Sequence, residues 1–465
     1  MSNLTTVEDK PINFFTYRTF KSKEKKYMYN TVSNTVFEVD SLILDILKNN
    51  GKTLGEIKGN LEPRYTSEKI IEAIHNMEEA YIIASEENKS VINKAISIKP
   101  TGKLSALTLF MIQECNLRCT YCYAEEGEYH DKGRMNEDVA FAAVDYLIEN
   151  APKELEELGL IFFGGEPLLN FPLIQKTVQY ALDKGKQLNK NFTFSMTTNG
   201  TLITPKIQSF LDQYKFGVQI SIDGNEKTHD FNRFYKGGQG SYNIILEKTK
   251  DMRETHRLRA RGTVTPAELE VLKSFEHLEK LGFTSIALSP AAYTLSDQHY
   301  KVLTKEMVKL VNYFKQLIEE ENYKQAFKMS NVIGMLYKLH QGGTKSHFCG
   351  AATNFLAVDV HGNLYPCHRF VSEKEYSLGS VFRYDALEKQ QKFIEDSHVQ
   401  NRNTCTTCWA RSLCGGGCHH ENLSETKNIQ EPPINYCKMT KTFIDAVMKL
   451  YVGLTPEQKQ RIFAS

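Results

Sequence analysis

A chain of 465 residues is long enough to form two or three domains. Its 57 lysine and arginine residues nearly balance its 56 aspartate and glutamate residues, and a net charge of +1 gives no electrostatic reason to expect nucleic acid or a membrane surface as a partner. No run approaches about 18 consecutive apolar residues, and the N-terminal residues lack the basic and apolar regions of a signal peptide. The sequence therefore predicts a cytoplasmic protein with no transmembrane helix.

Residues 1–86 have the pattern of a small domain in which strands precede helices. Aromatic and β-branched residues predict strands within 14–20 and 26–39. Apolar residues at helical spacing then predict three helices, at 41–50, 53–62 and 66–83. Thr66 or Ser67 would cap the third helix. This order of elements is typical of a winged-helix domain.

The pattern resembles the RiPP recognition element, the domain that captures the leader of a ribosomally made precursor peptide. In that family the leader adds as an extra strand to the edge of the sheet, by β-augmentation. A winged helix that binds DNA and a purely structural domain are the alternatives, and no helix here is markedly basic, as a DNA-binding helix would be. The polar segment 87–103 is predicted to be a linker.

Residues 104–300 alternate short apolar runs with helical stretches. The predicted strands are 105–112, 158–165, 192–200, 216–224, 258–265 and 285–290. The predicted helices are 136–150, 171–188, 204–213, 242–256 and 267–281. Repeated strand–helix units imply an α/β fold with a parallel sheet, whose chemistry lies at the carboxyl ends of the strands.

Three cysteines follow the first of these strands: Cys115, Cys119 and Cys122. Thiolates bind soft metals, and three of them leave a fourth position open. A zinc site would need a fourth protein ligand, and no second CxxC pair lies close in the sequence. The CxxxCxxC spacing, with Tyr121 before the last cysteine, resembles the radical S-adenosylmethionine (SAM) family. The resemblance implies a partial (β/α)6 barrel and a 4Fe–4S cluster whose open iron binds SAM.

The same resemblance implies SAM contacts at the other strand ends. The GGEP motif at Gly164, Gly165 and Glu166 would approach the amino group of SAM, and the SxDG…HDxxR pattern would place Ser221 and Arg233 at the ribose and carboxylate. His229 and Asp230 of that pattern are expected to be structural supports. The remaining predicted cofactor contacts are Tyr121, Asn199 and Leu288.

Residues 301–344 are predicted to be bridging helices, and seven cysteines follow them. Their spacing resembles that of the SPASM domain, here residues 345–465, which carries two auxiliary 4Fe–4S clusters. The resemblance assigns one cluster to Cys349, Cys367 and Cys418, and the other to Cys405, Cys408, Cys414 and Cys437. Zinc knuckles are the alternative.

The ten cysteines thus divide as three, three and four. The first auxiliary set lacks a fourth cysteine, so its last iron would be open, or bound by another residue or by substrate. His347, His368 and Arg369 lie near this set in sequence, and each is expected to be an ordinary structural residue.

Membership of this family implies that SAM is cleaved reductively and that the resulting radical removes hydrogen from a substrate carbon. Electrons would come from a flavodoxin- or ferredoxin-like donor. With a leader-binding domain attached, the expected reaction is the formation of thioether links in a precursor peptide, of the ranthipeptide or sactipeptide type.

Several alternatives remain open. Anaerobic sulfatase maturases share the SPASM pattern, but they carry an aspartate base where this chain has His368. Carbon–carbon cross-linking and quinone-cofactor maturation would also use a leader-binding domain. A non-enzymatic iron–sulfur electron carrier would not need the GGEP motif.

Overall fold

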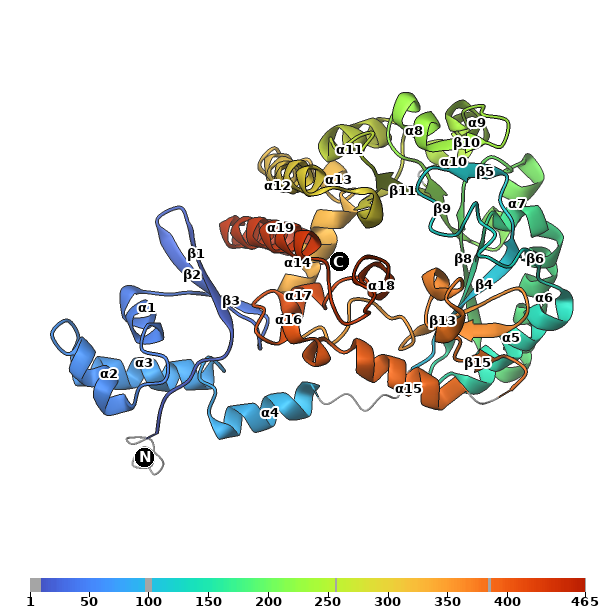
Figure 1. Ribbon diagram of the computed structural model, residues 1–465. Coiled ribbons are helices and arrows are strands. Elements are labelled where there is room, and N and C mark those ends of the chain that lie inside the picture. Colours follow the sequence, from blue (N-terminus) through green and yellow to red (C-terminus); the bar gives the residue numbers. More distant parts are fainter. Residues whose placement is uncertain (1–9, 97–102, 256, 384–385, 465) are drawn as a thin grey trace.

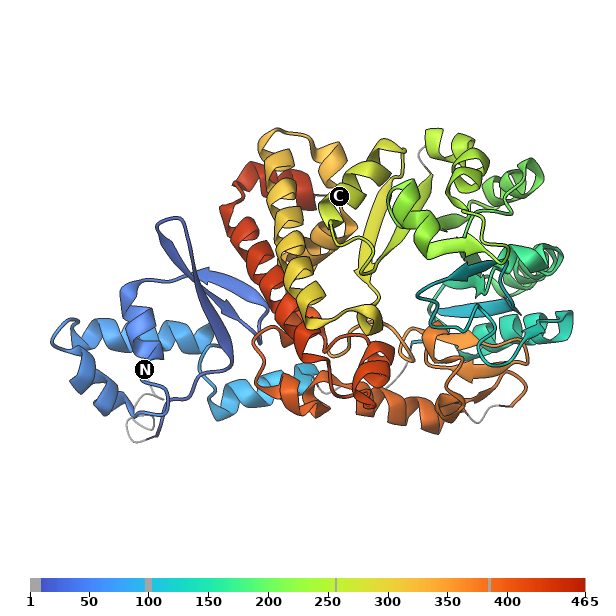
Figure 2. The same cartoon turned by 45° about the horizontal axis from the view of Figure 1, so that its top comes forward.

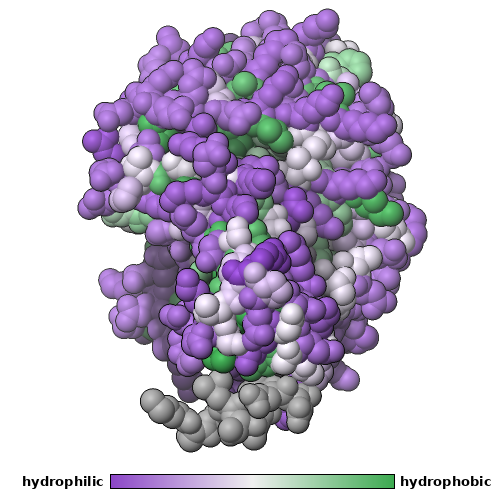
Figure 3. Space-filling model, turned by 90° about the vertical axis from the view of Figure 1, so that its left-hand side faces the viewer, coloured by the Kyte–Doolittle hydropathy of each residue, from purple (hydrophilic) through white to green (hydrophobic). Residues whose placement is uncertain are grey.

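The computed structural model describes residues 10–96, 103–255, 257–383 and 386–464. A small N-terminal domain lies to one side of a large α/β body (Figures 1 and 2). The face on the N-terminal side is mostly hydrophilic, with scattered apolar patches (Figure 3). None of the described helices is long and apolar enough to span a bilayer.

The N-terminal domain contains the strands and the three helices predicted from the sequence. Strands β1 (Tyr17–Ser22), β2 (Lys25–Asn30) and β3 (Thr35–Glu38) form an antiparallel sheet in that order. Helices α1 (Ser41–Leu47), α2 (Leu54–Leu61) and α3 (Ser67–Glu79) follow, and Met28, Ile46, Ile57 and Ile70 are fully buried between helices and sheet. Thr66 is the N-cap of α3, where its side chain accepts a hydrogen bond from Lys69 N.

The segment predicted as a polar linker contains a helix, α4 (Glu86–Ile96). The prediction missed it because its apolar residues are few. Two tertiary contacts help to hold its first turn, since the buried Asn88 side chain donates to the carbonyls of Glu78 and Ile83, at 2.9 Å each. Residues 1–9 of the predicted recognition element and 97–102 of the predicted linker lie outside the described residues.

The α/β fold with a parallel sheet is confirmed. Six strands pair in the order β12-β11-β9-β8-β7-β4, and all five pairings are parallel. They are β4 (Ala106–Gln113), β7 (Glu157–Gly164), β8 (Asn191–Thr198), β9 (Gly217–Ser221), β11 (Leu258–Val264) and β12 (Ser285–Pro290). Alternate residues of β7 and β8 are buried, so one face of each strand packs against the covering helices.

Helices connect these strands as expected: α5 (Glu137–Asn150), α6 (Phe171–Leu188), α7 (Pro205–Gln213), α8 (Glu226–Asn232), α9 (Tyr242–Lys248), α10 (Lys250–Glu254) and α11 (Val271–Lys280). The single helix predicted over 242–256 is wrong. It is divided at Thr249, whose buried hydroxyl donates to Ile245 O at 2.6 Å. Such a bond from a threonine back to the preceding turn bends a helix.

The C-terminal region continues the same sheet rather than forming a separate layer. Strand β13 (Phe355–Val358) pairs in parallel with β4, and β14 (Asn363–Tyr365) and β15 (Gly379–Ser380) extend the sheet antiparallel. The predicted hairpin turn at 361–363 is confirmed, because Asp359 accepts hydrogen bonds from the backbone of His361 and Asn363. The sheet thereby joins the two cysteine-rich parts of the chain.

Long helices close the other side of the molecule. Helix α12 (Asp297–Glu319) packs along α19 (Ile434–Gly453), beside α13 (Tyr323–Ala326) and α14 (Ser330–Gln341) (Figure 2). The remaining helices are α15 (Ala386–Ser397), α16 (Asn403–Thr406), α17 (Arg411–Cys414), α18 (His419–Thr426) and α20 (Pro456–Phe463). A separate apolar cluster joins Phe20 and Tyr29 of the N-terminal sheet to Leu413, Ile444 and Met448.

Candidate active site

A cavity of about 560 Å³ lies at the carboxyl ends of the parallel strands. One part of its lining comes from Cys115, Cys119 and Cys122 after β4. Another part comes from Cys349, Cys367 and Cys418 of the C-terminal region. Two of the three cysteine sets predicted from the sequence therefore share one enclosure, although more than 200 residues separate them in the chain.

The first set is held by short strands and by hydrogen bonds to sulfur. β5 (Leu117–Cys119) pairs with β10 (Arg233–Tyr235), which places Arg233 opposite Cys119. Arg233 Nη1 donates to Cys119 Sγ at 3.8 Å, and Cys115 Sγ accepts from Leu117 N at 3.4 Å and from Asn199 Nδ2 at 3.9 Å. Burial raises the pKa of Cys115 to about 12 and that of Cys119 to about 11. These thiols stay protonated until a bound metal replaces the proton.

Gly164 and Gly165 allow the end of β7 to contact the loop that carries Cys115. A Cβ atom on Gly164, whose φ is +139°, would lie 2.2 Å from Ile112 O. One on Gly165 would lie 2.2 Å from Glu114 O. Both neighbours are backbone atoms, so no side chain fits at either position without moving the chain.

Glu166 does not line the cavity. Its carboxylate is 1% exposed and accepts hydrogen bonds from Thr198 Oγ1 (2.7 Å), Asn199 N (2.8 Å) and Leu168 N (3.1 Å). Burial raises its pKa to about 7. In this structure the side chain fixes the end of β8, and so the position of Asn199, which does line the cavity.

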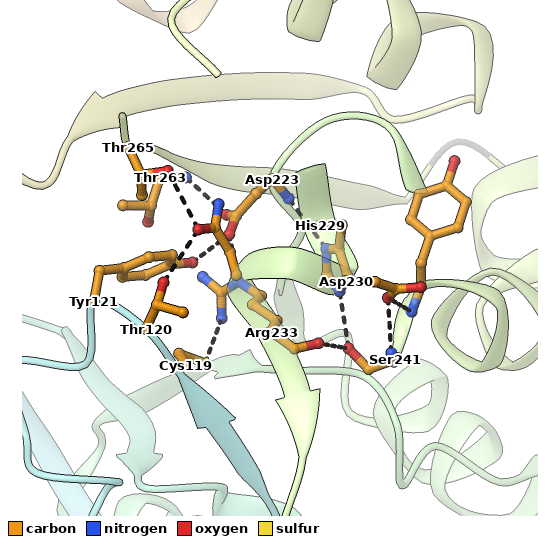
Figure 4. Close-up of polar contacts among 12 residues, drawn as sticks. Cys119, Thr120, Tyr121, Asp223, His229, Asp230, Arg233, Ser241, Thr263 and Thr265 are labelled. Atoms are coloured by element: carbon orange, nitrogen blue, oxygen red, sulfur yellow. Dashed lines mark hydrogen bonds and ion pairs between the residues drawn. The ribbon is translucent and has the colours of Figure 1, made fainter. Parts of the chain in front are cut away.

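Figure 4 shows a buried network around Asp223, to which the sequence assigned no role. Asp223 Oδ2 accepts from Arg233 Nε at 3.0 Å and from the Tyr121 hydroxyl, and Oδ1 accepts from Thr263 N at 2.8 Å. The Arg233 guanidinium also lies over the Tyr121 ring, 5.1 Å from its centre. Asp223 therefore neutralises Arg233 and orients it. Its place in the SxDG motif was the only signal in the sequence.

His229 and Asp230 lie beside this network, on the side away from Tyr121 (Figure 4). His229 Nδ1 accepts from Asp223 N at 3.3 Å, and Nε2 lies 2.9 Å from Ser241 Oγ, which donates to Arg233 O. Burial lowers the pKa of His229 to about 4, so the ring is neutral at pH 7. Asp230 Oδ1 accepts from the backbone of Ser241 and Tyr242. These contacts are the supporting role predicted for both residues.

Six of the eight predicted cofactor contacts line the cavity: Tyr121, Gly164, Gly165, Asn199, Ser221 and Arg233. Glu166 and Leu288 do not. Leu288 is 4% exposed and packs over Gly262, because alternation along β12 turns Ser289 rather than Leu288 toward the cavity.

Arg369 and Tyr123 lie between the two cysteine sets. Arg369 Nη1 donates to Cys418 Sγ at 3.7 Å and to Glu421 Oε1 at 2.8 Å, and its guanidinium lies 4.9 Å from the centre of the Tyr123 ring. Tyr123 directly follows Cys122. The sequence offered no signal for this pairing, which depends on tertiary contact alone.

His368 is half-buried at this cavity, with its ring centre 4.8 Å from that of Phe163. Burial, with help from Arg369, lowers its pKa to about 3. The imidazole is therefore uncharged over the whole physiological range.

The third cysteine set lies outside the cavity lining. Burial raises the pKa of Cys437 to about 12, and the thiols of Cys414, Cys405 and Cys408 add to this effect, so all four lie near one another. Over the described ranges, no three His, Cys, Asp or Glu side chains are placed to hold a single metal ion. In a four-iron cluster each thiolate binds a different iron, so the ligands need not meet at one point.

Residues 109–265, which span β4 to β11, match the family model of the radical SAM superfamily. This part of the chain is similar to radical SAM enzymes. This segment contains the first cysteine set and the strand ends that line the cavity.

The chain is also similar to curated proteins over most of its length. The chain is 25% identical over 380 residues to a cysteine-type anaerobic sulfatase-maturating enzyme of Clostridium novyi, covering 77% of this chain and 99% of that one. It is 27% identical over 462 residues to the radical SAM cyclopropyl synthase TigE of Paramaledivibacter caminithermalis, covering 92% and 93%. The structure of native anSMEcpe with bound AdoMet shares the fold, with a TM-score of 0.63 and 22% identity over 75% of this chain and 98% of that one.

The residues around the first cysteine set fit the SAM-binding cluster of a radical SAM enzyme. The set offers three thiols, with N–H donors from Leu117, Asn199 and Arg233 directed at two of the sulfurs. Such hydrogen bonds stabilise thiolate ligands and tune the cluster. Gly164 and Gly165 have no side chains, so their backbone lines the same cavity.

Proposed function

We propose that this radical SAM enzyme forms thioether links in a ribosomally made precursor peptide. One observation carries the proposal: two cysteine sets line one cavity, and only one of the chain's two C-terminal sets has four members. Cys349, Cys367 and Cys418 are three, and a cysteine of the peptide would supply the fourth thiol. That sulfur would then lie in the enclosure in which a neighbouring carbon loses hydrogen.

When bound, SAM and its cluster supply a 5′-deoxyadenosyl radical that removes hydrogen from carbon. The protein holds the parts in place. Arg233, fixed by Asp223, and Asn199, fixed by Glu166, orient the first set. Arg369 contributes a positive charge at the Cys418 sulfur. Cys405, Cys408, Cys414 and Cys437 would hold a second auxiliary cluster, and a flavodoxin- or ferredoxin-like protein would exchange electrons with the enzyme.

We further propose that the N-terminal domain is a RiPP recognition element. β3 pairs with β2 on one side, and no other described strand pairs with it. An extended leader peptide could add to that edge by main-chain hydrogen bonds.

SAM cleavage is the first test. Protein reconstituted anaerobically with iron and sulfide, then reduced with dithionite, should convert SAM to 5′-deoxyadenosine. The Cys115→Ala/Cys119→Ala/Cys122→Ala variant is the control and should produce none. If wild-type protein with a full complement of iron releases no 5′-deoxyadenosine, every radical SAM reading of its activity fails.

Mass spectrometry of the product is the second test. After co-expression with the cysteine-containing peptide encoded beside its gene, each thioether should remove two hydrogens and make one cysteine resistant to iodoacetamide. Cys367→Ala should abolish these changes while SAM cleavage continues, because Cys367 belongs to the second set alone. A modified peptide in which every cysteine still alkylates would contradict thioether formation.

Carbon–carbon bond formation is the second candidate, because the cyclopropyl synthase matches the chain nearly end to end. It also removes hydrogens but leaves cysteine thiols free, so alkylation separates the two reactions. Sulfatase maturation is less well supported, since a neutral His368 stands where those enzymes carry an aspartate base. A sulfatase-derived cysteine peptide that the enzyme leaves unmodified would agree with ranking sulfatase maturation below the other two reactions.

A further inference from the structure

Arg402 is a charged side chain with no exposed surface. Its Nε and Nη2 donate to Ser397 O at 3.2 and 2.8 Å, and Nη1 donates to Gly416 O at 2.5 Å. Nη2 also lies 2.5 Å from Nδ1 of His419. A guanidinium has only donors, so Nδ1 accepts this bond and the imidazole is neutral. All of these partners are therefore uncharged.

A buried guanidinium without a counter-charge destabilises a fold. Across residues 10–96, 103–255, 257–383 and 386–464, no carboxylate forms an ion pair with Arg402. Arg402 O accepts from Cys405 N at 2.8 Å, and Arg402 Nη1 donates to Gly416 O in the loop between Cys414 and Cys418. The buried cation is thus held beside the proposed ligands of both auxiliary sites.

The glycine-rich loop between the two auxiliary sets packs against the Arg402 side chain. Gly416 has a φ of +86°, and a Cβ atom there would lie 2.6 Å from Arg402 Nη1. Residues 415–417 connect Cys414 of the second auxiliary set directly to Cys418 of the first auxiliary set. The bond from Nη1 to Gly416 O therefore fixes the midpoint of the link between the two sites.

We propose that Arg402 is the shared counter-cation of the two auxiliary iron–sulfur sites. Its fixed charge raises the reduction potential of both clusters, because a cluster gains negative charge when it accepts an electron and a nearby cation stabilises that form. Its hydrogen bonds also hold the loop that joins the sites. Arg402 is a positioning residue rather than a catalytic one, and its role rests on the proposed assignment of two auxiliary clusters.

Arg369 differs in a way that makes it a useful comparison. Arg369 touches Cys418 but is already paired with Glu421. No described contact joins Arg369 to the second auxiliary set. Arg383, with an exposed side chain in the same region, is a surface control.

The test is an EPR-monitored redox titration with dithionite in the Cys115→Ala/Cys119→Ala/Cys122→Ala background, which retains only the auxiliary sites. Arg402→Gln should move both auxiliary midpoint potentials to more negative values. Arg402→Lys, which keeps the charge, should move them less. Arg369→Gln should shift only the site that contains Cys418, and Arg383→Gln should shift neither. Cys367→Ala and Cys437→Ala assign the two signals.

Unchanged midpoints in Arg402→Gln, or a shift of one site only, would overturn the proposal. If Arg402→Gln fails to hold its clusters, iron and sulfide content decides: retention in Arg402→Lys supports a charge role, and equal loss in both variants refutes it. Failure of the proposed cluster assignment looks different, because the triple-alanine background with Arg402 intact would then bind no iron.

Discussion

Asp223 shows how one residue organises the site. Its carboxylate joins Tyr121, Arg233 and the backbone of Thr263, which come from three separate parts of the chain (Figure 4). Arg233 in turn reaches the Cys119 sulfur. Because the carboxylate and the guanidinium are both buried, neither can be removed alone without leaving the other uncompensated.

Replacing Asp223 with Asn should therefore lower the free energy of unfolding by about 3 kcal/mol. The double variant Asp223→Asn/Arg233→Met should lose less than the sum of the two single changes, since no charge is left unpaired. Urea titration of the four proteins of this cycle measures the coupling. Additive losses would show that the pair contributes no coupling energy.

His229 should make stability depend on pH. Burial lowers its pKa to about 4 in the folded chain, below the value of 6.5 in the unfolded chain. The unfolded state therefore binds more protons between these values, so stability is complete above about pH 6.5 and falls as the pH drops toward 4. The loss should reach about 3 kcal/mol. The free energy of unfolding, measured by urea titration from pH 8 to pH 5, should fall less with decreasing pH in His229→Gln than in the wild type. An equal fall in both proteins would contradict the assignment.

At the scale of elements, the junction of β4 and β7 is the tightest contact of the site. In Gly165→Ala the added Cβ atom would lie 2.2 Å from Glu114 O, which would displace the loop that carries Cys115. We expect loss of the first cluster, seen as a lower iron content and no 5′-deoxyadenosine.

Gly334→Ala is the matched control for this change. Gly334 lies within α14, and nothing is within 4 Å of its added Cβ. Alanine in a helix interior should stabilise the fold by about 0.5–1 kcal/mol, with iron content unchanged. Normal iron content in Gly165→Ala would mean that the loop adapts and that the glycine is not required.

At the scale of the whole molecule, the N-terminal sheet packs directly on the loop that carries part of the third cysteine set. Thr31 Oγ1 donates to Trp409 O at 2.9 Å, and Ser412 Oγ donates to Thr31 O at 2.5 Å. Arg18 stacks over Trp409, 5.5 Å from the ring centre, and pairs with Asp445. Trp409 follows Cys408, so the N-terminal domain contacts the chain directly beside a member of that set.

Trp409→Ala should loosen this docking while leaving the central sheet intact. The loss of aromatic packing and of the cation–π contact should cost about 1–3 kcal/mol. Hydrogen exchange should quicken in β1–β3 and stay unchanged in β7 and β8. Phe382→Ala, which removes an aromatic that is 55% accessible and lies beside Gly362, away from this contact, should change neither. Unchanged exchange in β1–β3 would show that the sheet docks by other contacts.

Much of this architecture could be predicted from local sequence. The six parallel strands, most of the helices and the hairpin at 361–363 follow from periodicity and turn residues, which are short-range properties. Helix α4 was missed because its apolar residues are few, and the break at Thr249 was missed because a bond from its hydroxyl to the preceding turn decides it. The exclusion of Glu166 and Leu288 from the cavity lining depends on strand direction and burial, which no motif records.

The sequence by itself determined the match of residues 109–265 to the radical SAM model, the α/β class and the clustering of the cysteines at 115–122 and 349–437, because spacing along the chain carries that information. Only the tertiary structure decided that Cys115 and Cys367 line one cavity, that β13 continues the sheet of β4, and that the Arg402 guanidinium bonds to the loop between Cys414 and Cys418. The physical reason is distance along the chain. These contacts join residues up to several hundred positions apart, and only burial of the shared core brings them together.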